Sequence, residues 1–423
     1  MFQKGKWLMF VVLIFVLALA ACGGDDGAAT EDDVDTDQDT EVSADPVEEE
    51  EEEEAATGDA EIVTIGYSGP LSGPAAFYGE DTLTGLQLAA DEINEAGGFE
   101  VNGQRYELEI VSLDDQYLPD EAAANAKRLV QENNAKIVFN PHSGGIYAMQ
   151  VFNEQDDFLI GAYTSEPGIL AQGNSLTWRI PPGYDIYIEP FTKYQMDRFG
   201  EKISLVAPNS QYGVDWVDML KPAWEAAGGE VVFEEFVDFT ADTDFYTIVT
   251  NALEADPDVL FIGGASQPTA LIAKEARDLG FAGGFLIMDQ AKIEQMAAVL
   301  EGNIELLEGS IGTLPLMNAD FPGTADFIAK YQDRFDKEPV AEAGLHYVSL
   351  YIYVEAMKIA GSVDDTAAIR AALDEAAKSV PPEFQAYELL GVTEEGANIT
   401  HLMMGVVEDG EVKEITLEDL GLE

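Results

Sequence analysis

The feature that most constrains this chain is an alternation of short apolar runs with longer amphipathic runs, which occurs in two series. The first series extends from IVTIGY (62–67) to FLIGA (158–162). After an interruption at RIPPGYD (179–185), the second extends from KISLVA (202–207) to GFLIMD (284–289). Apolar strands separated by helix-length segments are typical of parallel sheets covered on both faces. The pattern therefore predicts an α/β fold with two doubly wound parallel-sheet lobes.

The last third of the chain is expected to be mainly helical and to end in a hairpin. The motif EDG (408–410) between two β-like runs is a hairpin signal.

Along the whole folded part, the expected helices are 80–96, 120–133, 145–156, 213–227, 244–255, 268–279, 292–300, 323–336, 342–360 and 364–377.

The N-terminus has the layout of an export signal. Lys4 and Lys6 precede an apolar stretch at 7–21, and small residues lead to Cys22. The motif LAAC (19–22) resembles the lipobox of bacterial lipoproteins, which predicts lipidation of Cys22 and an extracytoplasmic, membrane-anchored protein. A plain N-terminal membrane anchor is the alternative. Cys22 is the only cysteine, so internal disulfides and thiolate metal sites are excluded.

Residues 23–60 are expected to form a disordered acidic linker. They contain 18 acidic residues, no Lys or Arg and no aromatic residue, so they cannot bury a core. We interpret this segment as a tether, with binding of another protein as the alternative. The whole chain carries a formal net charge of −60, which disfavours nucleic acid and anionic lipid as partners. Such an acid-rich surface suits a saline environment, where screening relieves self-repulsion.

The segments that follow the expected strands are rich in hydroxyl groups, glycines and tyrosines. In open parallel sheets, ligands bind beyond the carboxyl ends of the strands. Hydroxyls and helix N-termini there can bind an anion, and a carboxylate can bind an ammonium group. These segments are SGPLSGPAAFYG (68–79), PHSGG (141–145), YTSEP (163–167), PNSQYG (208–213), ASQP (265–268) and DQAK (289–292).

No catalytic motif accompanies these segments. The sequence lacks G-x-x-x-x-G-K-[ST], G-x-S-x-G and H-E-x-x-H. Its three histidines, His142, His346 and His401, are scattered. We therefore expect a binding protein that is not an enzyme and that needs no metal or cofactor. Asp114 and Asp115 are interpreted as a structural turn or cap.

From about residue 61 onward the chain resembles the class I solute-binding proteins of ABC importers, and within them the leucine/isoleucine/valine-binding family. IGYSGPLSGPAAFYGEDTLTGLQLAADEINEAGG, APNSQYGVDW and DTDFYTIVTNALEADPDVLFIGG carry the resemblance, in order along the chain. It implies two lobes joined by a three-strand hinge, with crossings near 180–184, 310–314 and 386–392. The implied lobes are 61–180 with 311–387 and 181–310 with 388–423.

The resemblance also implies the ligand-binding residues. Tyr78 matches an aromatic residue that lies over the ligand in the family. Tyr212 matches a tyrosine of the second lobe that closes over the ligand. Asp289 matches the acid that binds an ammonium group. The hydroxyl and backbone groups for the ligand carboxylate are implied to come from Ser143, Gly144, Tyr163, Thr164 and Ser165.

The implied function is capture of an amino acid, of branched-chain type or related, and its delivery to an ABC permease by a monomeric protein. Tyr163 replaces a residue that is usually small, and the family's apolar contact near 340–347 does not align. An amide, urea or another small solute therefore stays open as the ligand. A ligand-sensing receptor subunit is the other alternative. The chain ends without the spanning helix of such sensors, which favours transport.

Overall fold

Two parallel sheets organise the part of the chain that this computed structural model describes, which is residues 60–73, 75–239 and 244–422. All described residues belong to one compact unit, Ala55–Glu423. The predicted export signal, Cys22 and nearly all of the predicted acidic linker lie outside the described residues. Within the described ranges, no helix combines the length and the apolar character that crossing a membrane requires.

The first sheet has six strands in the order β2-β3-β1-β4-β5-β6. All its pairings are parallel except the β2–β3 hairpin. Tyr67 of β1 lies between Ser112 of β3 and Phe139 of β4. The strands are β1 (Glu61–Gly69), β2 (Phe99–Val101), β3 (Gln104–Asp114), β4 (Ile137–Asn140), β5 (Leu159–Ala162) and β6 (Thr177–Arg179).

Helices cover both faces of the first sheet, and each face has its own apolar cluster. The helix α12 is buried along most of its length because its sequence is apolar on all sides. It packs against α1 at Gly85, where a Cβ would lie 2.1 Å from the Ala343 carbonyl oxygen. The helices are α1 (Ala76–Glu95), α2 (Pro119–Asn133), α3 (Ser143–Gln150), α4 (Asn153–Asp156), α5 (Gly168–Ala171), α11 (Thr324–Phe335), α12 (Ala341–Ala360) and α13 (Thr366–Ser379).

The second sheet has seven strands in the order β15-β14-β11-β10-β9-β7-β8. Strands β7, β8, β9, β10 and β11 pair in parallel, and the C-terminal hairpin adds two antiparallel strands at one edge. The strands are β7 (Lys202–Pro208), β8 (Glu230–Val237), β9 (Val259–Ile262), β10 (Gly284–Ile287), β11 (Ser310–Thr313), β14 (Met404–Glu408) and β15 (Glu411–Ile415).

The second sheet also separates two apolar clusters. The sequence pattern did not indicate α6, because Pro181, Pro182 and Gly183 interrupt the alternation and Pro190 lies inside the helix. The helices are α6 (Asp185–Arg198), α7 (Gln211–Ala226), α8 (Tyr246–Glu254), α9 (Ser266–Asp278) and α10 (Ile293–Val299), with 3₁₀ turns at Ile304–Leu307, Leu316–Asn318 and Pro382–Phe384.

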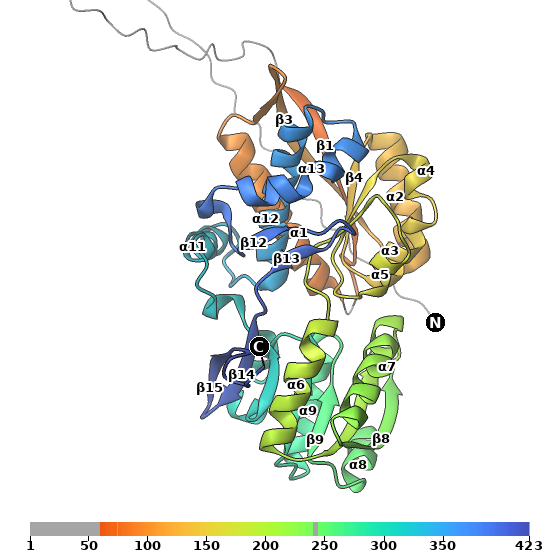
Figure 1. The fold of residues 1–423 in the computed structure, drawn as a ribbon, viewed down its shortest axis with the longest axis vertical. Helices are drawn as coiled ribbons and strands as arrows, with labels where there is room; N and C mark the ends of the chain where they lie inside the picture. The colour runs from red at the N-terminus through yellow and green to blue at the C-terminus, as the bar shows by residue number, and fades with distance from the viewer. Residues whose placement is uncertain (1–59, 74, 240–243, 423) are drawn as a thin grey trace, which may run out of the picture. The chain divides into compact units, whose positions relative to one another are not determined.

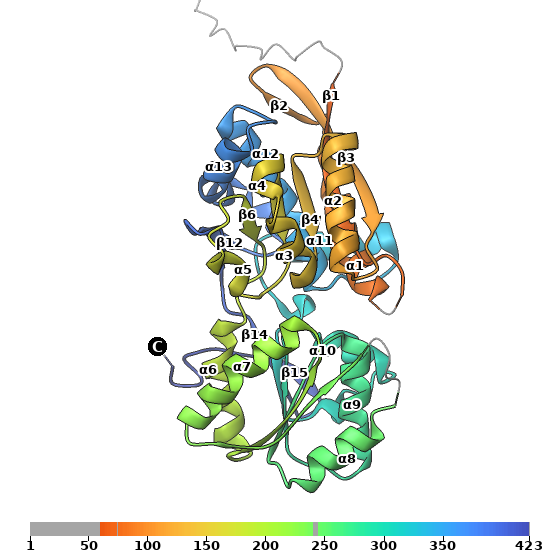
Figure 2. The ribbon, with the colours of Figure 1, turned by 90° about the vertical axis from the view of Figure 1, so that its right-hand side faces the viewer.

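A small antiparallel sheet, β12 (Leu389–Val392) with β13 (Asn398–Thr400), lies beside the first lobe (Figures 1 and 2). Trp178 donates its indole N–H to Asn398 over 2.7 Å, and Arg179 forms a parallel β-bridge with Ala397. The predicted division assigned 388–423 to the second lobe. These contacts favour a later boundary at 401–403, so we propose lobes of 60–180 with 314–400 and 181–313 with 401–422.

The strand orders locate the region where a ligand would bind. The connections leave in opposite directions from β1 and β4 in the first sheet and from β7 and β9 in the second. A crevice forms at such switch points, beyond the carboxyl ends of the strands. The expected binding segments follow these strand ends in both lobes.

Candidate functional site

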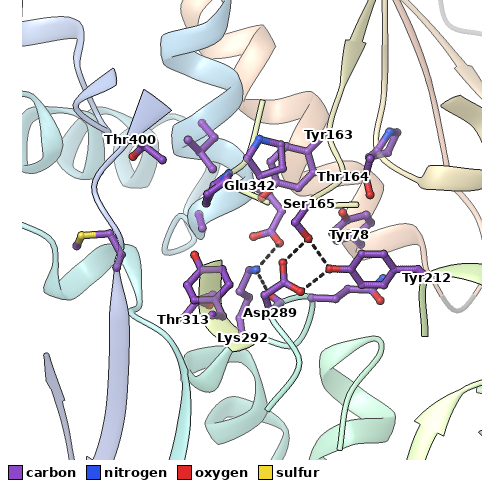
Figure 3. Close-up of a pocket in the computed structure, with 18 of the residues that line it drawn as sticks. Tyr78, Tyr163, Thr164, Ser165, Tyr212, Asp289, Lys292, Thr313, Glu342 and Thr400 are labelled. Carbon is purple, nitrogen blue, oxygen red and sulfur yellow. Dashed lines mark hydrogen bonds and ion pairs between the residues drawn. The ribbon is translucent and has the colours of Figure 1, made fainter. Parts of the chain in front are cut away.

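A cavity lies between the carboxyl ends of the strands of the two sheets (Figure 3). It encloses about 760 Å³ between side chains, including the part open to solvent. Seven of the eight predicted ligand-binding residues line it: Tyr78, Ser143, Tyr163, Thr164, Ser165, Tyr212 and Asp289.

The eighth predicted residue, Gly144, does not line the cavity. Its place follows from packing, because a Cβ there would lie 2.9 Å from Cγ of Pro119. Ligand contact by its backbone stays a prediction.

The loop after β1 brings Tyr78 to the cavity. Gly79 approaches the loop so closely that a Cβ would lie 1.8 Å from the Pro70 carbonyl oxygen. Tyr67 of β1 donates its hydroxyl to the Gly79 carbonyl over 2.7 Å, which ties the start of α1 to the sheet. Tyr78 then faces Tyr163, with 6.2 Å between ring centroids. Burial raises the pKa of both phenols, so both remain neutral donors.

Hydroxyl groups gather where β4 and β5 end. Ser143 and Thr164 are hydrogen-bonded through their hydroxyl oxygens at 2.7 Å. Ser143 does not cap α3, because the imidazole of His142 accepts the Gly145 N–H at Nδ1 over 3.0 Å. The Ser143 hydroxyl is therefore placed for other contacts beside the start of α3.

Asp289 is the acidic centre of the second lobe's wall. The residue is 8% exposed, and its carboxylate accepts the Ser165 hydroxyl at 2.5 Å and the Trp216 indole N–H at 3.0 Å. The Tyr212 hydroxyl donates to the same carboxylate. Burial, and next the Asp289 charge, raise the pKa of Tyr212 far above its usual range. Since Ser165 follows β5 and Asp289 follows β10, this cluster joins the two lobes.

A buried ion pair beside Asp289 was missed from the sequence. Lys292 Nζ lies 3.3 Å from Oε1 of Glu342 and donates to the Asp289 backbone carbonyl at 2.5 Å. Burial lowers the pKa of Lys292, but Glu342 and Asp289 outweigh it and the net shift is upward. Burial raises the pKa of Glu342, and Lys292 opposes this. Two features of the sequence could have indicated this pair. One is the lysine in DQAK, since lysine is rare in this acidic chain, and the other is the acid in VAEAGLHY, the segment that does not align with the family.

Further polar contacts between the lobes surround the cavity. Gln295 of α10 donates to Asp81 of α1 at 3.0 Å. Gln290 donates to the Tyr117 hydroxyl at 3.3 Å. Together with the Asp289 cluster, these bonds hold the two walls against each other.

His142 and Asp115 form a supporting network. Asp115 accepts the Ser68 hydroxyl and the Asn140 amide, each at 3.1 Å, and lies 3.1 Å from Nε2 of His142. Because Nδ1 accepts the Gly145 N–H, Nε2 carries the proton that is donated to Asp115. Neither nitrogen can act as a base toward Ser143. Asp115 is structural, as predicted, and the described residues contain no cluster suited to a metal ion.

Glu166 lies next to Ser165 and is also buried. Its carboxylate accepts the Gly168 N–H at 2.9 Å and the Tyr184 hydroxyl at 3.1 Å. Burial, with the charge of Asp215 on α7, raises the pKa of Glu166 to about 7.

The comparisons with known proteins agree with this geometry. The family model described as periplasmic binding protein matches residues 62–402. The Leu/Ile/Val-binding protein homolog 1 of Brucella melitensis is 26% identical over 304 residues, which cover 71% of this chain and 80% of that protein.

Two solved structures share the fold. A leucine-binding protein from Thermotoga maritima has a TM-score of 0.71 and 23% identity, and the match covers 84% of this chain and 98% of that one. A branched-chain amino acid transporter substrate-binding protein from Streptococcus pneumoniae, in complex with isoleucine, has a TM-score of 0.71 and 21% identity, covering 84% and 99%. With the two parallel-dominated sheets, this likeness confirms the predicted α/β fold of two doubly wound lobes.

Proposed function

This chain belongs to the periplasmic binding protein family, and we propose that it captures an amino acid in the cavity between its lobes and delivers it to the permease of an ABC transporter. The relatives named Leu/Ile/Val-binding protein support an amino acid as the ligand. The family consists of extracytoplasmic solute-binding proteins, which confirms the expectation that the chain is not an enzyme.

The observation that carries the proposal is the division of polar groups across the cavity. Donors lie on the first lobe, where Ser143, Thr164 and Ser165 surround the start of α3. A carboxylate can accept hydrogen bonds from such hydroxyls and from helix N-terminal amides. The acceptor lies on the second lobe, where the buried Asp289 can pair with an ammonium group. One zwitterion can satisfy both sets only when the lobes are closed around it.

The remaining parts of the proposal concern delivery. Closure of the lobes forms the surface that a permease would recognise, and the three crossings between lobes permit hinge motion. We propose that lipidation at Cys22 and the acidic segment after it keep the binding lobes near the membrane. The lipobox motif and the charge of 23–60 support this.

The experiment that tests the proposal is a thermal-shift screen against the twenty amino acids, acetamide and urea, followed by calorimetric titration. A ligand that binds only the folded cavity raises stability by about 2.7 kcal/mol at one hundred times its Kd. We expect at least one amino acid to raise Tm in a concentration-dependent way. A screen in which no amino acid changes Tm at millimolar concentration would contradict the proposal.

A further inference from the structure

The lining of the cavity includes a buried ion pair between Lys292 and Glu342. Both residues line the cavity, and Lys292 is only 7% exposed and Glu342 only 2% exposed. They come from opposite lobes, since Lys292 precedes α10 and Glu342 lies in the first turn of α12 (Figure 3). Glu342 lies in the segment 340–347, where the family's apolar contact does not align.

The pair leaves an acceptor without a donor. Oε1 of Glu342 faces Lys292, but the buried Oε2 has no hydrogen-bond partner among the described residues. The hydroxyl of Thr313, which also lines the cavity, is likewise unpartnered within the described ranges. A buried acceptor without a donor carries its full desolvation cost. A ligand that supplies a donor here removes that cost.

The pair also leaves a donor. A lysine ammonium group has three N–H donors. The described contacts of Lys292 Nζ use two of them, toward the Asp289 carbonyl and toward Oε1 of Glu342. A donor and an acceptor therefore lie next to each other at the cavity, one from each lobe. A primary carboxamide offers the complementary arrangement, with a carbonyl oxygen beside an amino group.

We infer that Lys292 and Glu342 form a subsite for a carboxamide, so that the preferred ligand is an amino acid with an amide side chain, glutamine or asparagine. The inference rests on the proposed function for its amino-acid head group. The amide carbonyl accepts from Lys292, and the amide nitrogen donates to Oε2 of Glu342. An aliphatic side chain leaves the third Lys292 N–H and Oε2 of Glu342 unpaired, and a site built to hydrogen-bond its ligand rejects analogues that lack the matching group.

The test is a calorimetric comparison of glutamine, asparagine, leucine and valine on the wild-type protein. We expect the better amide ligand to bind at least about tenfold more tightly than either aliphatic one. The double variant Lys292→Met/Glu342→Leu removes both charges, so no unpaired charge stays buried. It should reduce this preference at least about tenfold.

Two further variants complete the design. Lys221→Met/Glu234→Leu makes the same substitutions in a surface pair, 2.6 Å apart and outside the cavity lining, and should leave the preference unchanged. Glu342→Gln keeps the volume and the contact to Lys292 but replaces the free acceptor with a donor. It should weaken glutamine at least about tenfold relative to leucine, and it serves if the double variant does not fold.

The inference is overturned if wild type binds leucine or valine as tightly as the amides. It is also overturned if the cavity variants weaken all four ligands equally, since Glu342 would then bind the ammonium group. Acetamide separates the two proposals. If no amino acid binds but acetamide binding requires Lys292 and Glu342, the amide subsite stands and the amino-acid proposal fails. If acetamide does not bind either, both fail.

Discussion

Asp289→Asn separates an amino-acid site from a site for a neutral solute. The change keeps the volume of the side chain but removes the charge that would pair with the ligand's ammonium group. Because Asp289 is only 8% exposed, solvent would screen this pair weakly. Breaking a buried hydrogen-bonded charge pair costs about 2–5 kcal/mol, which corresponds to about 30- to 4,000-fold in Kd.

The assay is calorimetric titration of wild type and variant with the tightest amino acid found in the screen. Asp218→Asn removes one acid from the exposed face of α7, outside the cavity, and should leave Kd unchanged. The variant should fold, because an asparagine can still accept the Trp216 indole N–H that now reaches the carboxylate. A loss below about threefold would show that Asp289 does not bind the ammonium group.

Three other outcomes are expected. Glu166→Gln should remove a pH dependence of stability, because the folded pKa of Glu166, about 7, lies above its ordinary value. As pH rises from about 4.5 to about 8, the free energy of unfolding of wild type should fall by about 1–3 kcal/mol relative to the variant. Denaturant titrations that show the same pH dependence for both proteins would contradict this. Gly85→Ala should lower the free energy of unfolding by about 1–3 kcal/mol, because the new Cβ meets the Ala343 carbonyl; unchanged urea midpoints would show that the α1–α12 contact relaxes freely. Cys22→Ser should move the protein from the membrane fraction of the producing cells to the soluble fraction, and an unchanged distribution on immunoblots would reject lipid anchoring.

The repeated strand pattern predicted the parallel strands of both sheets except β6, and it predicted that their carboxyl ends face the site. Within DVLFIGG, the strand Val259–Ile262 is apolar and buried at every position, as expected for a strand covered on both faces. Once the strands are known, their carboxyl ends identify the segments that can line a site. The resemblance to the solute-binding proteins then selects Tyr78, Ser143, Ser165, Tyr212 and Asp289 within these segments, and the cavity is lined by all five.

The elements that the sequence did not predict depend on tertiary contacts. α6 contains Pro190, yet Tyr187 and Phe191 on the same helix are buried against the second sheet, so packing overrides the local breaker. The short strand β13 is held by the indole of Trp178, which is 220 residues away in the chain. The local pattern of apolar and polar residues does not indicate such a distant contact.

The ion pair in the cavity illustrates the same limit within the site. Lys292 and Glu342 are fifty positions apart and belong to opposite lobes, so nothing in either segment indicates that they meet. Glu342 also lies in a helix whose apolar residues suggest a buried packing element. Only the closed arrangement of the lobes shows that its carboxylate reaches the cavity.

A crystal structure of the protein with its tightest amino-acid ligand would show directly how the cavity binds an amino acid. We predict one molecule between the lobes, with its ammonium group in hydrogen-bond distance of Asp289 and its carboxylate against the hydroxyls of Ser143, Thr164 or Ser165. Ligand density outside this cavity, or a carboxylate placed against Asp289, would show that the protein does not bind an amino acid in this way.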